Sequence, residues 1–186
     1  MNDSAPSAHK EVERSGMDER VNRAKRGDRN AIGELVQEHY ARVYRFCARR
    51  VGEDLAQDAA QETFLTMQRM VKRFEGRSGF ETWLLGIAHN HCRNLARKRQ
   101  RDPASLEDWF EMETKDHGEQ VADRESLRCA LKSLSPEHRE VVLLHEVEGL
   151  TYAEVAQVAG VPEGTVKSRL YHAFRNLRET LSEVTV

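Results

Sequence analysis

Apolar residues recur at steps of three and four along most of the chain, which is the spacing of an amphipathic α-helix. A first stripe follows Asp28, whose carboxylate can cap a helix, and ends before Gly52, a residue type that favours helix ends. The pattern predicts one helix over residues 29–51. Its apolar positions are Ile32, Leu35, Val36, Tyr40, Val43 and Cys47.

Two more stripes complete an N-terminal set of helices. One starts at Leu55 and finishes near Phe74, before a loop over residues 75–79. Ser78, with Glu81 three residues later, predicts a capping box that opens a third helix, and this helix runs into a group of arginines. A short helix over residues 21–26 is expected to pack on this set.

A second set of helices is predicted after residue 124. A short helix over residues 127–134 ends before Ser135 and Pro136, which cap and open the next helix. That next helix carries Val147 and stops at Gly149.

The last two helices form a recognisable pair. Thr151 and Glu154 predict a second capping box for a short helix that Gly160 ends. Pro162 then opens a long basic helix. Two helices joined by a tight glycine-containing turn, the second of them basic, are typical of a helix-turn-helix.

The long helix can be divided into two faces at 100° per residue. One face is apolar and is expected to point into the bundle; it holds Val166, Leu170, Ala173 and Leu177. The opposite face holds short polar side chains and cations, which can enter a major groove and contact base edges and phosphates. It comprises Gly164, Ser168, Tyr171 and Arg175, flanked by Thr165, Lys167 and His172, with Arg169 nearer the buried edge.

The predicted fold class is all-α: two small helical domains joined by a flexible acidic linker, the second with a helix-turn-helix. We expect a disordered N-terminal tail at residues 1–17 and a helical bundle at 18–101. The acidic linker is expected at 102–123, the helix-turn-helix domain at 124–180 and a tail at 181–186.

Composition narrows the class of protein. A chain of 186 residues with 39% hydrophobic and 32% charged residues has room for small helical modules and excludes a large multidomain enzyme. No apolar run approaches the length of a membrane span, and the polar start is no secretory signal. The 3 widely spaced cysteines fit reduced thiols, so we expect a cytoplasmic protein without membrane insertion.

Charge is unevenly distributed along the chain. Residues 93–101 contain five basic residues and no acid, whereas residues 102–125 contain nine acids and two bases. Residues 164–178 again hold four basic residues and no acid. Two basic modules joined by an acidic segment suggest a protein that binds nucleic acid at two places.

The sequence gives little support for an enzyme active site or a metal site. The chain has no glycine-rich phosphate loop, zinc-protease motif or nucleophile with an evident base, so we predict no catalytic residue and no cofactor. His89 and Cys92 would share a helix face, which raises the alternative of a metal or redox sensor. His91 lies well off that face, and no second ligand pair has metal spacing, so no metal site is predicted.

Both modules resemble one family. Residues 134–136, 149–156 and 164–170, read as Leu-Ser-Pro, Gly-Leu-Thr-Tyr-Ala-Glu-Val-Ala and Gly-Thr-Val-Lys-Ser-Arg-Leu, closely resemble region 4 of bacterial sigma factors of the extracytoplasmic-function (ECF) group. The first module resembles region 2 of the same group. Its matching residues are Asp58, residues 61–65 (Gln-Glu-Thr-Phe-Leu), Phe74, Phe80, residues 82–84 (Thr-Trp-Leu), residues 87–88 (Ile-Ala), Asn90 and the arginines that follow.

The resemblance implies a promoter-specificity subunit that binds core RNA polymerase, recognises two promoter elements and helps to open the duplex. It implies contacts with the clamp helices of the largest polymerase subunit by Asp58, Gln61, Glu62, Phe64 and Leu65, and contacts with the polymerase flap. For Phe64, packing in the core is an equal alternative. It also implies control by an anti-sigma factor.

The resemblance further implies two sets of promoter contacts. The minus-ten set, which would capture a flipped base and hold the strand, is Phe74, Arg77, Ser78, Phe80, Asn90, Arg93, Arg97, Lys98 and Arg99. Trp83 is nearby, but its place on the apolar stripe favours a core role. The minus-thirty-five set is Thr165, Lys167, Ser168, Arg169, Tyr171, His172 and Arg175.

Two further expectations complete the interpretation. In this family the linker threads the RNA exit path of the polymerase, and its negative charge would imitate RNA. The alternative function is a stand-alone helix-turn-helix transcription regulator, which would bind DNA specifically without polymerase and would leave the match at residues 58–65 unexplained.

Overall fold

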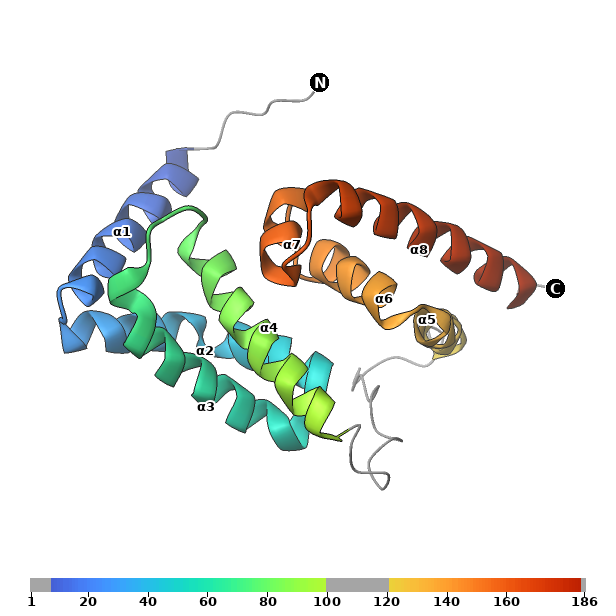
Figure 1. Ribbon diagram of the computed structural model, residues 1–186, viewed down its shortest axis with the longest axis horizontal. Coiled ribbons are helices and arrows are strands. Elements are labelled where there is room, and N and C mark those ends of the chain that lie inside the picture. The colour runs from blue at the N-terminus through green and yellow to red at the C-terminus, as the bar shows by residue number, and fades with distance from the viewer. Residues whose placement is uncertain (1–7, 100–120, 185–186) are drawn as a thin grey trace.

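A computed structural model describes residues 8–99 and 121–184. The predicted linker at 102–123 therefore lies almost wholly outside the described residues. Every regular element in the described ranges is helical (Figure 1). The all-α prediction is confirmed.

The N-terminal module packs three helices around a central one. They are α1 (Ala8–Lys25), α2 (Arg29–Val51), α3 (Glu53–Met70) with a 3-10 turn η1 (Val71–Arg73), and α4 (Phe80–Arg99). The central helix α2 contacts the other three helices. Fully buried Leu35 and Phe46 of α2, Met67 of α3 and Leu84 of α4 form the core, so the apolar stripes meet as predicted.

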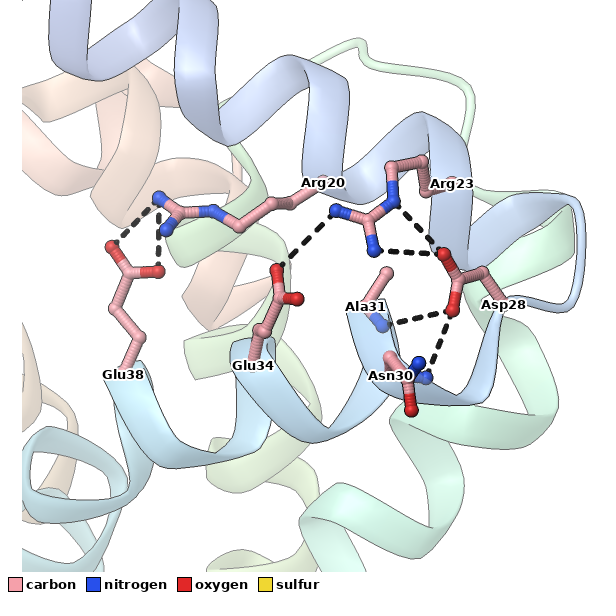
Figure 2. Close-up of polar contacts among 7 residues, drawn as sticks. All are labelled: Arg20, Arg23, Asp28, Asn30, Ala31, Glu34 and Glu38. Carbon is pink, nitrogen blue, oxygen red and sulfur yellow. Dashed lines mark hydrogen bonds and ion pairs between the residues drawn. The ribbon is translucent and has the colours of Figure 1, made fainter.

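Asp28 caps α2 and ties it to α1 (Figure 2). Its Oδ1 accepts hydrogen bonds from the backbone N–H groups of Asn30 and Ala31 at 2.9 and 3.2 Å. Arg23 of α1 donates to the other carboxylate oxygen at 2.9 Å and also lies 3.5 Å from Glu34. The predicted cap is confirmed, and these bonds lower the pKa of Asp28.

The first helix is longer than the sequence predicts. It begins at Ala8, so most of the stretch expected to be disordered, residues 1–17, is helical, and residues 1–7 lie outside the described part. Val21 and Ala24 are buried in the core and Met17 packs against it. This anchor at the C-terminal end lets good helix formers upstream continue the helix, because propagation costs less than nucleation.

The C-terminal module consists of α5 (Val121–Ser133), α6 (Pro136–Val142), a π-helical turn η3 (Leu143–Val147), α7 (Tyr152–Ala159) and α8 (Glu163–Val184). Ser135 caps α6, with Pro136 at its first position, as predicted. Thr151 and Glu154 form the predicted capping box, and Gly160 ends α7 in the left-handed conformation at φ 69°. α7 and α8 form the helix-turn-helix (Figure 1).

The capping box predicted at Ser78 is wrong. The first helical bond of α4 runs from Trp83 N to the carbonyl of Gly79, and the buried Ser78 hydroxyl has no hydrogen-bond partner within the described structure. Glu81 is instead 2.9 Å from Arg42 of α2. The Glu81 carboxylate, which the local pattern assigned to the cap, therefore forms an ion pair with a residue of another helix.

Candidate polymerase and nucleic-acid interfaces

The long helix α8 presents the two faces predicted for it. Val166, Leu170, Ala173 and Leu177 are all buried. Across the helix, Lys167, Ser168, Tyr171, His172 and Arg175 are exposed, with Tyr171 at 67%. A polar and basic row therefore faces solvent along α8, as a reading helix requires.

Two residues of the predicted α8 set are less exposed. Thr165 is half-buried, and its carbonyl accepts a hydrogen bond from the Ser168 hydroxyl at 3.0 Å. Arg169 is also half-buried and lines a cavity between the modules. Its position near the buried edge is the one expected from the helical wheel.

Helix α3 carries an exposed row of acid, amide and apolar side chains. Asp58, Gln61, Glu62 and Leu65 are exposed, with Leu65 at 41%. Phe64 differs, because it is 8% exposed and its ring stacks on Tyr40 with centroids 6.1 Å apart. The structure thus places Phe64 in the core, which was the alternative to a docking role.

A groove separates α3 from α4. It has a volume of about 460 Å³ and is bordered by Asp58 and Glu62 on one side and by Arg97 and Lys98 on the other. His91 lies in the same groove, and its Nε2 is 3.0 Å from Thr66 Oγ1. The acidic row of α3 and the basic end of α4 are therefore neighbours.

Three aromatic rings pack under the loop before α4. The ring centroid of Trp83 lies 5.0 Å from that of Phe74 and 5.6 Å from that of Phe80. Phe80 is 5% exposed, whereas Phe74 and Trp83 are partly buried. Arg77 projects from the loop with its side chain 82% exposed, beside Glu75. The loop thus has an aromatic base and a charged rim, and the core role expected for Trp83 fits its contacts.

Helix α4 carries the basic row predicted for it. Asn90, Arg93, Arg97 and Lys98 are exposed. Arg99 is the last residue of the helix, and its side chain lies outside the described ones. The row lies at helical steps of three and four residues, so it borders one side of α4.

The two modules touch through contacts that the sequence analysis missed. Glu148, whose side chain is 4% exposed, lies 3.0 Å from Nη1 of Arg49 and 3.6 Å from Nη1 of Arg50. Arg42 donates to the Glu148 carbonyl at 3.0 Å, and Thr82 donates to Glu154 at 2.8 Å. These partners are 72 to 106 residues apart in the chain, so no local pattern pairs them.

His89 and Cys92 lie on the buried side of α4. The side chain of His89 is 4% exposed, and burial together with Arg50 and Arg93 lowers its pKa to about 4. Cys92 is buried beside Cys47 of α2, and this contact, together with burial, raises the pKa of the Cys47 thiol. In the described ranges no three His, Cys, Asp or Glu side chains gather as metal ligands.

Comparison with known families matches both modules. The family model of sigma-70 region 2 matches residues 35–102, and that of sigma-70 region 4 matches residues 124–177. The chain is 32% identical to the ECF RNA polymerase sigma-E factor of Escherichia coli over 167 residues, which is 82% of this chain and 87% of that protein. The chain belongs to the ECF group of the sigma-70 family.

A second relative extends the likeness. The ECF sigma factor SigE of Mycolicibacterium smegmatis is 36% identical over 168 residues, which cover 84% of this chain and 65% of that protein. The ECF sigma factor therefore has relatives in which both modules are matched in the same order.

Solved structures agree with this assignment. The sigma factor RpoE of Bartonella quintana, crystallised with the anti-sigma factor NepR, is 27% identical with a TM-score of 0.62, covering 81% of this chain and 96% of that one. CnrH, solved with the cytosolic domain of CnrY, is 24% identical with a TM-score of 0.65, and its likeness concerns the fold. In the part of the sigma factor that the structure describes, no helix combines the length and apolarity of a bilayer span.

Sigma-70 factors bind core RNA polymerase and direct it to promoters, and this is the function that family membership assigns to the chain. The match of both modules favours this function over that of a stand-alone helix-turn-helix regulator.

Proposed function

We propose that this ECF sigma factor docks on core RNA polymerase through the exposed row of α3 and contacts promoter DNA through α4 and α8. The observation that carries the proposal is the separation of these rows by charge. Acid and amide groups line α3, whereas basic groups line α4 and α8. Each row therefore suits a different partner, a protein surface or a polyanion.

The docking surface comprises Asp58, Gln61, Glu62 and Leu65. An exposed apolar side chain among acids and amides makes a small interface with an apolar centre and a polar rim. Phe64 lies beneath this surface and supports it through Tyr40. The proposed partner of this surface is the clamp-helix region of the largest polymerase subunit. The polymerase flap is the proposed partner of the C-terminal module.

The minus-ten element is contacted by the loop at residues 74–78 and by the basic row of α4. Flipping a base costs a few kcal/mol and requires a pocket with cationic support. Exposed Arg77 and partly buried Phe74 supply these at the loop, while Arg93, Arg97, Lys98 and Arg99 hold the strand. Phe80 is buried, so its part is to position Phe74 and Trp83.

The minus-thirty-five element is read by the outer face of α8. Lys167, Arg175 and His172 contact phosphates or bases, and Ser168 and Tyr171 reach base edges. Thr165 lies at the first turn of the helix, where reading helices commonly approach the groove. Arg169 is half-buried and suits a phosphate at the edge of the site.

Regulation and location follow from the same assignment. We expect an anti-sigma factor, because a structural neighbour was solved with one. We also expect the protein to act in the cytoplasm, where the bacterial polymerase lies, and to contribute no catalytic group of its own. Its acidic linker would occupy the RNA exit path until nascent RNA displaces it.

The test is run-off transcription with bacterial core polymerase on a library of promoter fragments, together with co-purification of core. Wild type should join core and start transcription at a defined set of sequences. Asp58→Arg should reduce retention of core by roughly tenfold or more. Asp18→Arg, at a site on α1 that is also exposed, serves as the matched control and should retain core.

The outcomes separate the alternatives. Loss of core binding by Asp58→Arg alone supports the α3 surface. Equal binding by both variants would place the docking surface elsewhere. Specific binding of the free protein to duplex DNA, with no association with core, would support the stand-alone regulator instead.

A further inference from the structure

A cavity of about 440 Å³ lies between the two modules. Helices α2 and α4 form one wall, and α6 and α8 contribute to the other. Its lining includes six arginines from both modules: Arg49, Arg50, Arg93, Arg97, Arg139 and Arg169. This is a dense concentration of guanidinium groups around a partly open cavity.

Only part of this positive charge is neutralised. Arg49 and Arg50 share the single carboxylate of Glu148. The acidic side chains in the lining itself are Glu137 and Glu140. Among the described residues, six arginines and two glutamates line the cavity, Glu148 lies beside it, and Arg97 also borders the groove that holds Asp58 and Glu62. The lining itself therefore carries an excess of positive charge.

The arginines differ in how many contacts their guanidinium groups already make within the protein. Arg139 donates to the carbonyls of Leu131, Lys132 and Leu134 at 2.7 to 3.0 Å, so it holds the end of α5. The guanidinium groups of Arg93 and Arg169 make no hydrogen bond or close ion pair in the described ranges, although both lie near enough to Glu140 to favour its charged form. These two guanidinium groups, one from each module, are therefore available to a ligand.

Two side chains that line the cavity hold buried polar atoms without hydrogen-bond partners. The side chain of Arg50 is 11% exposed, and its buried Nη2 atom makes no hydrogen bond within the described structure. His89, 4% exposed, lines the cavity, and neither of its ring nitrogens makes a hydrogen bond there, although Nε2 lies 3.1 Å from a Glu140 oxygen. Unsatisfied buried donors are costly, so a shift of either side chain toward the acceptor oxygens of a ligand would be stabilising.

The remaining lining is apolar. Ala96, Leu143, Ala159 and Val161 form part of the wall. The volume lies within the range of about 300 to 1,000 Å³ that is usual for small-molecule sites. A ligand that matches both parts has several anionic oxygens and an organic body.

We propose that this cavity binds a small organic anion that carries two or more phosphate groups. Guanidinium groups bind phosphate through paired, charge-assisted hydrogen bonds, and a multivalent phosphate matches the surplus charge. Arg93 from one module and Arg169 from the other hold the phosphates, and the apolar wall contacts the organic body. Because both modules contribute, the bound anion holds them together.

A consequence of the proposal rests on the proposed function. Arg93, Arg97 and Arg169 are also assigned to promoter contacts, so an anion in the cavity competes with DNA for them. The ligand would then favour the closed arrangement over the promoter-bound one. Binding itself does not depend on this consequence and is tested without polymerase.

The test is calorimetric titration of the full chain with ATP, inorganic pyrophosphate and adenosine at physiological salt. ATP and pyrophosphate should bind with one-to-one stoichiometry and adenosine should not. Arg93→Gln and Arg169→Gln should each weaken ATP binding by roughly tenfold, the usual loss for one charged hydrogen-bond donor. ATP binding more tightly than pyrophosphate assigns a role to the apolar wall, and equal affinities assign the site to the phosphates alone.

Two control variants test whether ATP binding depends on the cavity arginines specifically. Arg175→Gln on α8 and Lys98→Gln on α4 remove exposed cations that do not line this cavity, and both should bind ATP like wild type. An equal loss in all four variants would show diffuse attraction of anions and would overturn the site. Absence of ATP and pyrophosphate binding at millimolar concentration would overturn it as well, while leaving the sigma-factor function intact.

Discussion

Oε1 of Glu148 lies 3.0 Å from Nη1 of Arg49, although the two residues are 99 positions apart in the chain. The carboxylate is almost fully buried and also faces Arg50 at 3.6 Å. It comes from the turn before the helix-turn-helix, and the arginines come from the last turn of α2, the central helix of the N-terminal module. One side chain therefore joins the two halves of this sigma factor.

Replacing Glu148 with Gln should destabilise the closed arrangement. The variant leaves the largely buried Arg50 without its carboxylate, and breaking such a pair costs about 3 kcal/mol in free energy of unfolding. Urea denaturation followed by circular dichroism measures the change. Glu146→Gln is the control, because Glu146 is 52% exposed and 3.7 Å from His145. If both variants unfold alike, the pair does not hold the modules.

Thr82→Val should loosen the contact between the modules without unfolding either one. The variant keeps the shape of a side chain that is 3% exposed but loses the 2.8 Å hydrogen bond to Glu154. The capping box survives, since Glu154 Oε2 still accepts from Thr151 N at 2.9 Å. We expect a cost of about 1 kcal/mol to module association.

Small-angle X-ray scattering gives the readout for Thr82→Val as an increased radius of gyration. Thr66→Val is the matched control, because it removes a contact with His91 inside the N-terminal module. Its radius should equal that of wild type. A radius unchanged in both variants would mean that the Thr82 contact is dispensable.

Stability should fall in acid because of His89. Its folded pKa of about 4 is below the ordinary value of 6.5, so the unfolded chain binds the proton more readily. The stabilising effect is complete above pH 6.5 and is lost as pH falls toward 4, with a total on the order of 3 kcal/mol. Nearby Arg50 and Arg93 favour the neutral ring, and the raised pKa of Glu140 opposes part of the loss.

Denaturation at a series of pH values tests this assignment. His89→Gln should flatten the decline between pH 6.5 and 4, and His172→Gln, at an exposed site, should leave it unchanged. His39 is also buried with a lowered pKa, so a residual slope is expected. An undiminished slope in His89→Gln would assign the acid sensitivity to other groups.

Lys167 and Tyr171 should contribute to promoter binding in different ways. Lys167→Ala removes an exposed cation now 2.8 Å from Glu163, so the holoenzyme should lose affinity evenly across sequences, and its salt slope should fall by about 1. Tyr171→Ala should change the preference among minus-thirty-five sequences, because base-edge contacts carry specificity. Lys132→Ala, exposed on α5, is the control for charge. A shift in preference caused by Lys167→Ala would reverse these roles.

The chain alone determined the helices and most of their ends, because caps and stripes act between residues a few positions apart. Asp28, Ser135 and the Thr151–Glu154 box all cap as predicted. The inward and outward faces of α8 also follow from local periodicity. The family was predictable because two motif sets in a defined order are specific.

The tertiary structure decided everything that depends on distant partners. Glu81 pairs with Arg42 and does not form the predicted cap. Phe64 is buried and stacks on Tyr40. The arginine-lined cavity forms where segments far apart in the chain meet. The ion pairs of Glu148 with Arg49 and Arg50 form in the same way. Such pairings depend on packing across the whole molecule, and residue spacing along a helix carries no information about them.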